Sequence, residues 1–129
     1  MSAMSRNKGK SGEREAAALI ADLTGWDVRR RVRQHDGDSD LEGVPGWSIE
    51  VKRHASAGRS EIARWWRQCV AQAGSLRPVL LFRLDRDSWR VVWPLALHLT
   101  GDPGAWPDYD MTVEGSPQAW AAVARELAP

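Results

Sequence analysis

The chain has little of what a disulfide, a zinc site or a membrane span requires. Its 129 residues include one cysteine, Cys69, so no disulfide forms within the chain, which suits a reducing cytoplasm. No set of His and Cys has the spacing of zinc ligands. No apolar run approaches the roughly 20 residues of a membrane helix, and the polar N-terminus does not resemble a secretory signal. We therefore expect one globular domain in the cytoplasm.

Charge is unevenly distributed along the chain. Residues 1–98 contain 17 Lys and Arg against 12 Asp and Glu, whereas residues 99–129 contain one Arg against five Asp and Glu. A basic body suits binding to the phosphate backbone of a nucleic acid, and an acidic tail would be repelled by it. The excess of +5 in the first part is modest, so a purely solvated surface stays an alternative.

Hydrophobic periodicity predicts an α/β fold. Apolar residues at helical spacing predict a helix from Ser11 to Thr24, a second from Ser60 to Gly74 and a third from Ser116 to Leu127. Strands are predicted over 26–33, 47–52, 78–84 and 89–93. Residues 1–10 are small, polar and basic, and we interpret them as a flexible arm that orders on DNA.

The predicted strand from Trp47 to Lys52 has two chemically different faces. Side chains alternate along a strand, so Trp47, Ile49 and Val51 point to one face and form a core side. The other face presents Glu50 beside Lys52. This pairing of an acidic and a basic side chain on one face of a strand makes Glu50 and Lys52 candidate catalytic residues.

Asp40 is predicted to lie opposite Glu50. A three-residue turn over 44–46 would close a hairpin in which Asp40 faces Glu50 with Cβ atoms roughly 5 Å apart, where like charges are destabilising. Two carboxylates held that close favour a hard divalent cation, Mg²⁺ or Mn²⁺. Asp36 and Asp38 precede Asp40 closely and are alternatives for the first carboxylate.

These residues carry a resemblance to a known group. Asp40 followed by Glu50-Val51-Lys52 resembles the D…(D/E)-x-K signature of the restriction-endonuclease-like PD-(D/E)XK nuclease superfamily. The basic lead K-G-K-S-G-E-R-E over residues 8–15 is similar to the archaeal-type Holliday junction resolvases and their phage-encoded relatives. The resemblance covers about residues 6–93. Ser39 departs from it, since many members have proline there.

The resemblance implies a fold and an activity. We expect a mixed β-sheet flanked by helices, with an α-β-β-β-α-β-β nuclease core over residues 11–98 and an acidic, helical extension over 99–129 packed on the same domain. The implied activity is hydrolysis of phosphodiester bonds in four-way DNA junctions by a homodimer, with Mg²⁺ or Mn²⁺ and no organic cofactor. The implied setting is the cytoplasm of a bacterial or phage-infected cell, with no membrane partner.

The resemblance also assigns roles to residues. Asp40, Glu50, the Val51 carbonyl and Glu13 would bind the metal, and Lys52 would orient the attacking water or offset charge in the transition state. A carboxylate such as Glu13 near the start of a helix also has a simpler explanation, because it complements the helix dipole. The expected DNA contacts are Lys8, Lys10, Arg14, Arg29, Arg31, Arg33, Arg53, His54 and Gln68.

Three other functions stay open. The same catalytic fold would also suit another structure-specific, nicking or repair endonuclease of phage type, which differs only in its DNA target. A non-catalytic DNA-binding module could keep the fold and lack the activity. An unrelated α/β protein could carry the Glu50-Val51-Lys52 triplet by chance.

Overall fold

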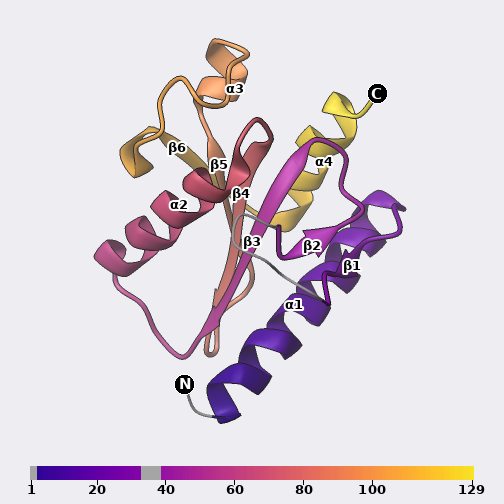
Figure 1. The fold of residues 1–129 in the computed structure, drawn as a ribbon, viewed down its shortest axis with the longest axis vertical. Helices are drawn as coiled ribbons and strands as arrows, with labels where there is room; N and C mark the ends of the chain where they lie inside the picture. The colour runs from indigo at the N-terminus through magenta and orange to yellow at the C-terminus, as the bar shows by residue number, and fades with distance from the viewer. Residues whose placement is uncertain (1–2, 33–38) are drawn as a thin grey trace.

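The computed structural model describes residues 3–32 and 39–129, with side-chain environments from residue 9 onward. Groups of strands are separated by helices along the chain (Figure 1). In chain order they are α1 (Ala3–Thr24), β1 (Arg29–Arg30), β2 (Leu41–Glu42), β3 (Trp47–His54), α2 (Arg59–Ala73), β4 (Arg77–Leu84), β5 (Arg90–Pro94), α3 (Ala96–Leu99), the 3-10 helix η1 (Tyr109–Met111), β6 (Thr112–Gly115) and α4 (Pro117–Leu127). None of the described helices is both long and apolar enough to cross a membrane.

The central sheet is mixed, with the strand order β3-β4-β5-β6. β3 and β4 run parallel with Glu50 opposite Leu80, and α2 makes the crossover between them. β5 pairs antiparallel with β4, and β6 pairs antiparallel with β5. The predicted mixed sheet flanked by helices is confirmed, and β3 stands at one end of the strand order.

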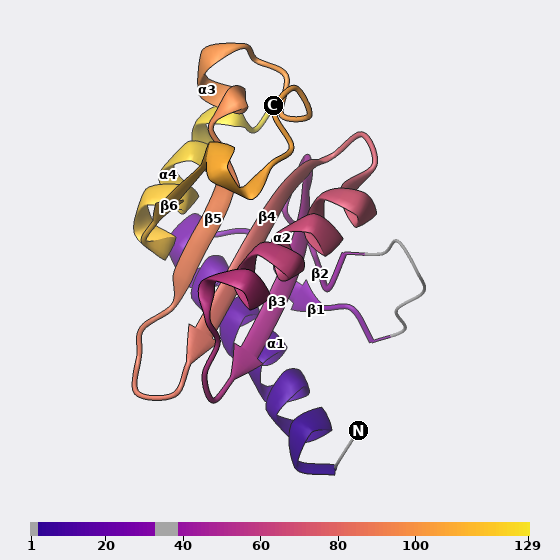
Figure 2. The same cartoon turned by 90° about the vertical axis from the view of Figure 1, so that its left-hand side faces the viewer.

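Two hydrophobic clusters fill the two faces of the sheet. α1 and α4 cover one face and α2 covers the other (Figures 1 and 2). Val79 and Leu81 of β4 belong to the first cluster, and Leu80 and Phe82 to the second. All four are fully buried, which confirms β4 as a strand covered on both faces.

The helix α1 begins earlier than predicted. It starts at Ala3, so Ser11 lies inside the helix and does not cap it, and most of the predicted arm over 1–10 is helical. The predicted start of the helix at Ser11 is therefore wrong, whereas the flexibility of the arm and its ordering on DNA stay predictions. At α2 the residue before the helix is Gly58, not Ser60, whereas Gly74 ends the helix with φ 58°, as predicted.

The three strands expected between the first two helices do not form one sheet, and the predicted hairpin that pairs the Asp40 strand with β3 is wrong. β1 is two residues long instead of spanning 26–33, and it pairs with β2 in a separate two-stranded sheet. β2 forms no ladder with β3. Gly43, with φ +99°, turns the chain after β2, and a Cβ there would collide with the Asp27 carbonyl. The β1–β2 ribbon thus lies beside β3 without extending the main sheet (Figure 2).

The C-terminal segment completes the core. α4 follows the prediction, with the Ser116 hydroxyl capping the helix by accepting the Ala119 N–H. Trp120 is fully buried and packs edge-on against Trp47, with ring centroids 5.5 Å apart. Trp47, Trp89 and Trp93 all belong to the core.

Candidate functional site

The site lies at β3, the edge strand of the main sheet. Trp47, Ile49 and Val51 face the cluster under α1, as the alternation predicts. Glu50 and Lys52 face the opposite way, and the Lys52 Nζ lies 3.3 Å from the Glu50 Oε1. Glu50 is nevertheless only 6% exposed. A buried carboxylate with a single cationic neighbour is costly to keep ionised, which marks this part of the strand as unusual.

Asp40 reaches β3 through backbone contacts on both sides. Its N–H donates to the Ile49 carbonyl at 2.8 Å, and its carbonyl accepts the Arg31 N–H at 3.0 Å. Its carboxylate Oδ2 accepts the Val51 N–H at 2.8 Å. The predicted ladder with Asp40 directly opposite Glu50 is absent, since the backbone bond joins Asp40 to Ile49. The carboxylate itself is held at the strand, one residue from Glu50.

The direction of the Val51 N–H also places the Val51 carbonyl. In a strand, the N–H and C=O of one residue point to the same side, as in pairs that exchange both hydrogen bonds. Since the Val51 N–H points away from β4 toward Asp40, its carbonyl oxygen lies on that same outer side. The Asp40 carboxylate and the Val51 carbonyl oxygen therefore lie at the edge of β3 away from β4, and Glu50 is near enough for its charge to act on Asp40.

Burial and mutual repulsion shape the electrostatics of the pair. Burial, with the charge on Glu50 as the second cause, raises the pKa of Asp40 to about 7, although the Val51 N–H opposes the shift. Burial also raises the pKa of Glu50, and Lys52 partly offsets it. Both carboxyl groups thus retain protons more strongly than in water. Cys69 is buried, and burial raises the pKa of its thiol.

Ser39 fixes the approach of Asp40, and sequence reasoning missed it. Its hydroxyl accepts the Ile49 N–H at 2.8 Å and lies 2.7 Å from the Leu41 carbonyl oxygen. Ile49 would otherwise present an unpaired donor, because β2 makes no ladder there. Ser39 thus replaces a missing ladder bond at the residue before Asp40. The departure from proline in the sequence was the only signal.

Glu13 approaches from α1 and is paired with an arginine. Its Oε1 accepts a hydrogen bond from Arg30 Nε at 2.9 Å, and both side chains are largely buried. Glu13 lies well inside α1, so the helix-dipole explanation does not apply. Its charge nevertheless acts on both Asp40 and Glu50. Arg30, one of three consecutive arginines over 29–31, is a second residue that sequence reasoning left out of the site.

The approach of α1 depends on a glycine. A Cβ on Gly12 would lie 2.7 Å from the Cβ of Arg53, so the helix and β3 cross here with no room for a side chain. Glu13 is the next residue. The crossing at Gly12 therefore sets how near Glu13 comes to the strand.

The donor set fits a magnesium ion. Over residues 3–32 and 39–129, no three or more His, Cys, Asp and Glu side chains lie close enough to hold a metal, so Glu13 does not join Asp40 and Glu50 in one cluster. Mg²⁺ commonly takes only one or two carboxylates, with waters and substrate phosphate oxygens as its other ligands. Asp40, Glu50 and the Val51 carbonyl could supply that set, and burial together with the charge on Glu50 raises the pKa of Asp40. The alternatives Asp36 and Asp38 lie outside the described residues.

The expected DNA contacts fall into two groups. Arg53 and His54 continue β3 beyond Lys52, where Arg53 binds Asp85 at 2.8 Å and the His54 ring lies 4.7 Å from that of Trp65. Arg31 donates to the Ser39 carbonyl at 2.9 Å. The others lie further out: Lys10 and Arg14 are exposed on α1, Gln68 is exposed on α2, and Arg29 pairs with Asp27. The Lys8 side chain and Arg33 lie outside the described residues.

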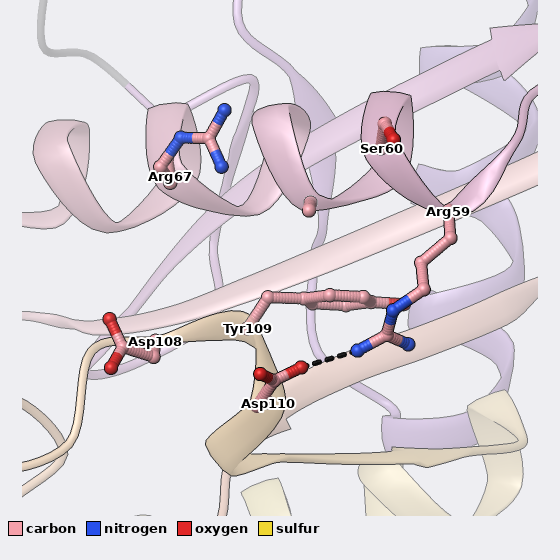
Figure 3. A pocket seen from close by; sticks show the side chains of 7 residues that line it. Arg59, Ser60, Arg67, Asp108, Tyr109 and Asp110 are labelled. Atoms are coloured by element: carbon pink, nitrogen blue, oxygen red, sulfur yellow. Dashed lines mark hydrogen bonds and ion pairs between the residues drawn. The ribbon is translucent and has the colours of Figure 1, made fainter.

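Away from these residues, a cavity of about 440 Å³ lies between α2 and η1 (Figure 3). Arg59 is ion-paired with Asp110 there, and its guanidinium lies 5.0 Å from the centroid of the Tyr109 ring. Both partners are more than two-thirds exposed. Exposed charges that pair with each other interact weakly with other groups, so this cavity is a poorer candidate for the site than β3.

Comparisons with known proteins agree with these features. The model of a phage PDDEXK endonuclease family matches residues 4–109. Protein D14 of Escherichia phage T5 is 26% identical over 114 residues, which cover 70% of this chain and 71% of that protein. Among solved structures, Hjc of Archaeoglobus fulgidus, a Holliday junction resolvase from an archaeal hyperthermophile, is similar with a TM-score of 0.47 and 20% identity over 65% of this chain and 70% of that one.

Proposed function

The chain belongs to this phage PDDEXK endonuclease family, and on that premise we propose that it is a Mg²⁺-dependent endodeoxyribonuclease that cuts branched DNA, with the four-way junction as its preferred substrate. One observation carries the catalytic part of the proposal. Asp40 and Glu50 are brought together in buried surroundings at the outer side of β3, with Lys52 beside them. A pair of ionisable carboxylates in such a position costs stability, which is typical of groups kept for function.

Each residue of the site has a distinct task. Asp40, Glu50 and the Val51 carbonyl would hold Mg²⁺ (or Mn²⁺), which when bound polarises a phosphoryl oxygen and lowers the pKa of water. The Nζ of Lys52 is 3.3 Å from Glu50 Oε1. Lys52 can donate a hydrogen bond to the attacking water or to the phosphoryl oxygens, on which negative charge develops in the transition state. Glu13 adds negative charge to the site and is oriented by Arg30.

The junction preference is supported by the sequence around Glu13. The lead over residues 8–15 is similar to that of resolvases, and the helix α1 that it forms approaches β3 at Gly12. A four-way junction presents two symmetric strands, so we propose a homodimer with one site per strand. Recognition would depend on branched shape and backbone contacts rather than base sequence.

The proposal is tested with end-labelled DNA and purified full-length protein. An immobile four-way junction is incubated with Mg²⁺ beside matched duplex, flap and single-stranded DNA, using the wild type, Glu50→Gln and the control Asp110→Asn. We expect paired symmetric nicks on the junction with the wild type and the control, and none with Glu50→Gln. Cleavage confined to duplex or flap would replace the junction by another DNA target. Tight binding without any cleavage would refute the enzyme.

A further inference from the structure

A cavity of about 290 Å³ lies beside the first part of β3, and its lining includes residues next to Asp40 and near Glu50 in the chain. Its lining includes Ser48 of β3, Ser39 before Asp40, and Gln72 near the end of α2. Ser48 lies two residues from Glu50 on the same face of the strand, a distance of about 6.7 Å at the usual rise per residue. The stacked nucleotides of one DNA strand advance about 3.4 Å each. The cavity is therefore within about two nucleotides of the carboxylates.

Ser48 supplies an unused hydrogen-bonding group at the floor of this cavity. It is only 4% exposed, and among the described residues its hydroxyl has no hydrogen-bond partner. The side-chain amide of Gln72 likewise makes no hydrogen bond to any described residue. Ser48 is buried as a residue, but its hydroxyl is not among the fully enclosed unpaired atoms, so it opens onto the cavity and can pair with a group bound there.

The lining suits a planar, polar ring better than a phosphate. A hydroxyl and an amide both donate and accept hydrogen bonds, as the edges of nucleobases do. Trp47, Ala73 and Leu76 supply the apolar part of a lining that is more polar than apolar. The charged residues in the lining are Arg31 and Glu42, whose charges cancel, whereas a phosphate site needs a cationic excess.

We propose that this cavity, which we call the β3 base pocket, receives one unstacked nucleobase beside the phosphate that is cut. The inference rests on the proposed function and adds a reason for its preference for branched DNA. A base inside a continuous duplex must lose its pairing and stacking to enter, whereas a base at a branch point is already partly released. Ser48 and Gln72 would be specificity-determining residues for the DNA target.

The test follows individual bases by fluorescence. 2-Aminopurine is placed at each of the four positions flanking the cleavage site in a junction, and its emission is measured on binding wild type, Ser48→Val, Gln72→Ala and the control Gln118→Ala, in EDTA and in Ca²⁺. Emission of this base rises when it leaves the stack. We expect a several-fold rise at one position with the wild type and Gln118→Ala. Gln72→Ala should reduce the rise and Ser48→Val, which fills the floor, should abolish it.

Binding and Mg²⁺-dependent cleavage of the same DNA are measured in parallel. Binding and cleavage without a rise at any position would overturn the base pocket and leave the nuclease intact. A rise that is equal in all four proteins would also overturn it. Protein that neither binds nor cuts DNA would overturn both proposals. Because Gln72 is partly exposed on a helix surface, Gln72→Ala keeps the test valid even if Ser48→Val does not fold.

Discussion

Two carboxylate sites of the molecule, the Asp40–Glu50 pair at β3 and Asp110 opposite α2, show that burial decides how strongly an acid interacts with nearby charges. Asp110 and Arg59 form an ion pair in water, with side chains 79% and 70% exposed. Glu50 is buried and Asp40 is partly buried, and burial raises the pKa of Asp40 to about 7. Solvent screens the first group, so its charges contribute little. In the second group burial disfavours the charged form of both acids, and a divalent cation bound there would favour it.

Neutralising either buried carboxylate should have the largest effect. For Asp40→Asn or Glu50→Gln we expect cleavage to fall by at least about 10²–10³-fold, since one electrostatic group of a catalytic site is removed. DNA binding should be retained or improved, because negative charge near the phosphates is lost. Single-turnover cleavage and binding by anisotropy measure the two quantities. A variant that cuts at the wild-type rate would remove its carboxylate from the mechanism.

The same pair should make the metal-free protein sensitive to pH. Folded Asp40 keeps its proton up to about pH 7, whereas the unfolded chain releases it near 3.9, so the folded state binds more protons in between. The free energy of unfolding should therefore fall as pH rises from about 4 to about 7, by at most about 4 kcal/mol. Urea melts in EDTA across this range measure it. Asp40→Asn should flatten the profile, and an unchanged slope in that variant would contradict the assignment.

Removing the Ser39 hydroxyl should weaken both fold and activity. Ser39→Ala leaves the Ile49 N–H without its partner, which costs about 1–3 kcal/mol for a buried donor. Asp40 is the next residue, so we expect a higher Mg²⁺ concentration for half-maximal cleavage as well. Ser39→Thr, which keeps the hydroxyl, should restore both. Loss of stability with an unchanged Mg²⁺ dependence would show that Ser39 only supports the fold.

Two glycines of α1 should respond to alanine in opposite directions. Gly12→Ala places a methyl group against Arg53, and overpacking of this kind costs about 1–3 kcal/mol. Gly9→Ala meets nothing within 4 Å and should stabilise the helix by about 0.5–1 kcal/mol. Thermal melts compare the two variants. Gly12→Ala should also slow cleavage, because Glu13 moves away from β3. Equal stability changes would refute the close crossing.

Breaking the exposed ion pair should have the smallest effect. Asp110→Asn removes the partner of Arg59, and exposed pairs contribute about 0–1 kcal/mol. We expect a change in stability within that range and a cleavage rate equal to that of the wild type. Melts and cleavage assays in low and high salt measure both. A marked loss of activity would place the α2–η1 cavity in the functional surface after all.

The sequence predicts regular elements well where burial is simple. The face of β3, the stripe of α2 and the continuous apolar run of β4 each carry a strong period, and all three are confirmed. The start of α1 was missed because Gly9 and Gly12 lower helix propensity, while packing of Gly12 against Arg53 depends on a contact distant in sequence.

The sequence predicted the main residues of the site, but it did not predict the hydrogen bonds and ion pairs that hold them. Alternation alone puts Glu50 and Lys52 on one face, and turn residues bring Asp40 back toward them. The hairpin register was wrong because β2 pairs with β1, and the missing ladder bond is made by the Ser39 side chain. The Arg30–Glu13 pair joins β1 to α1, a contact for which the chain has no local pattern.

Binding of Mn²⁺ tests the central claim most directly, because it asks whether the buried carboxylates hold a divalent cation. Free Mn²⁺ is followed by electron paramagnetic resonance at pH 8 as full-length wild type, Glu50→Gln or Asp110→Asn is added. The account predicts that wild type and Asp110→Asn bind Mn²⁺ equally, that Glu50→Gln binds far more weakly, and that binding weakens below pH 7 as protons compete for Asp40. Equal binding by Glu50→Gln would contradict it.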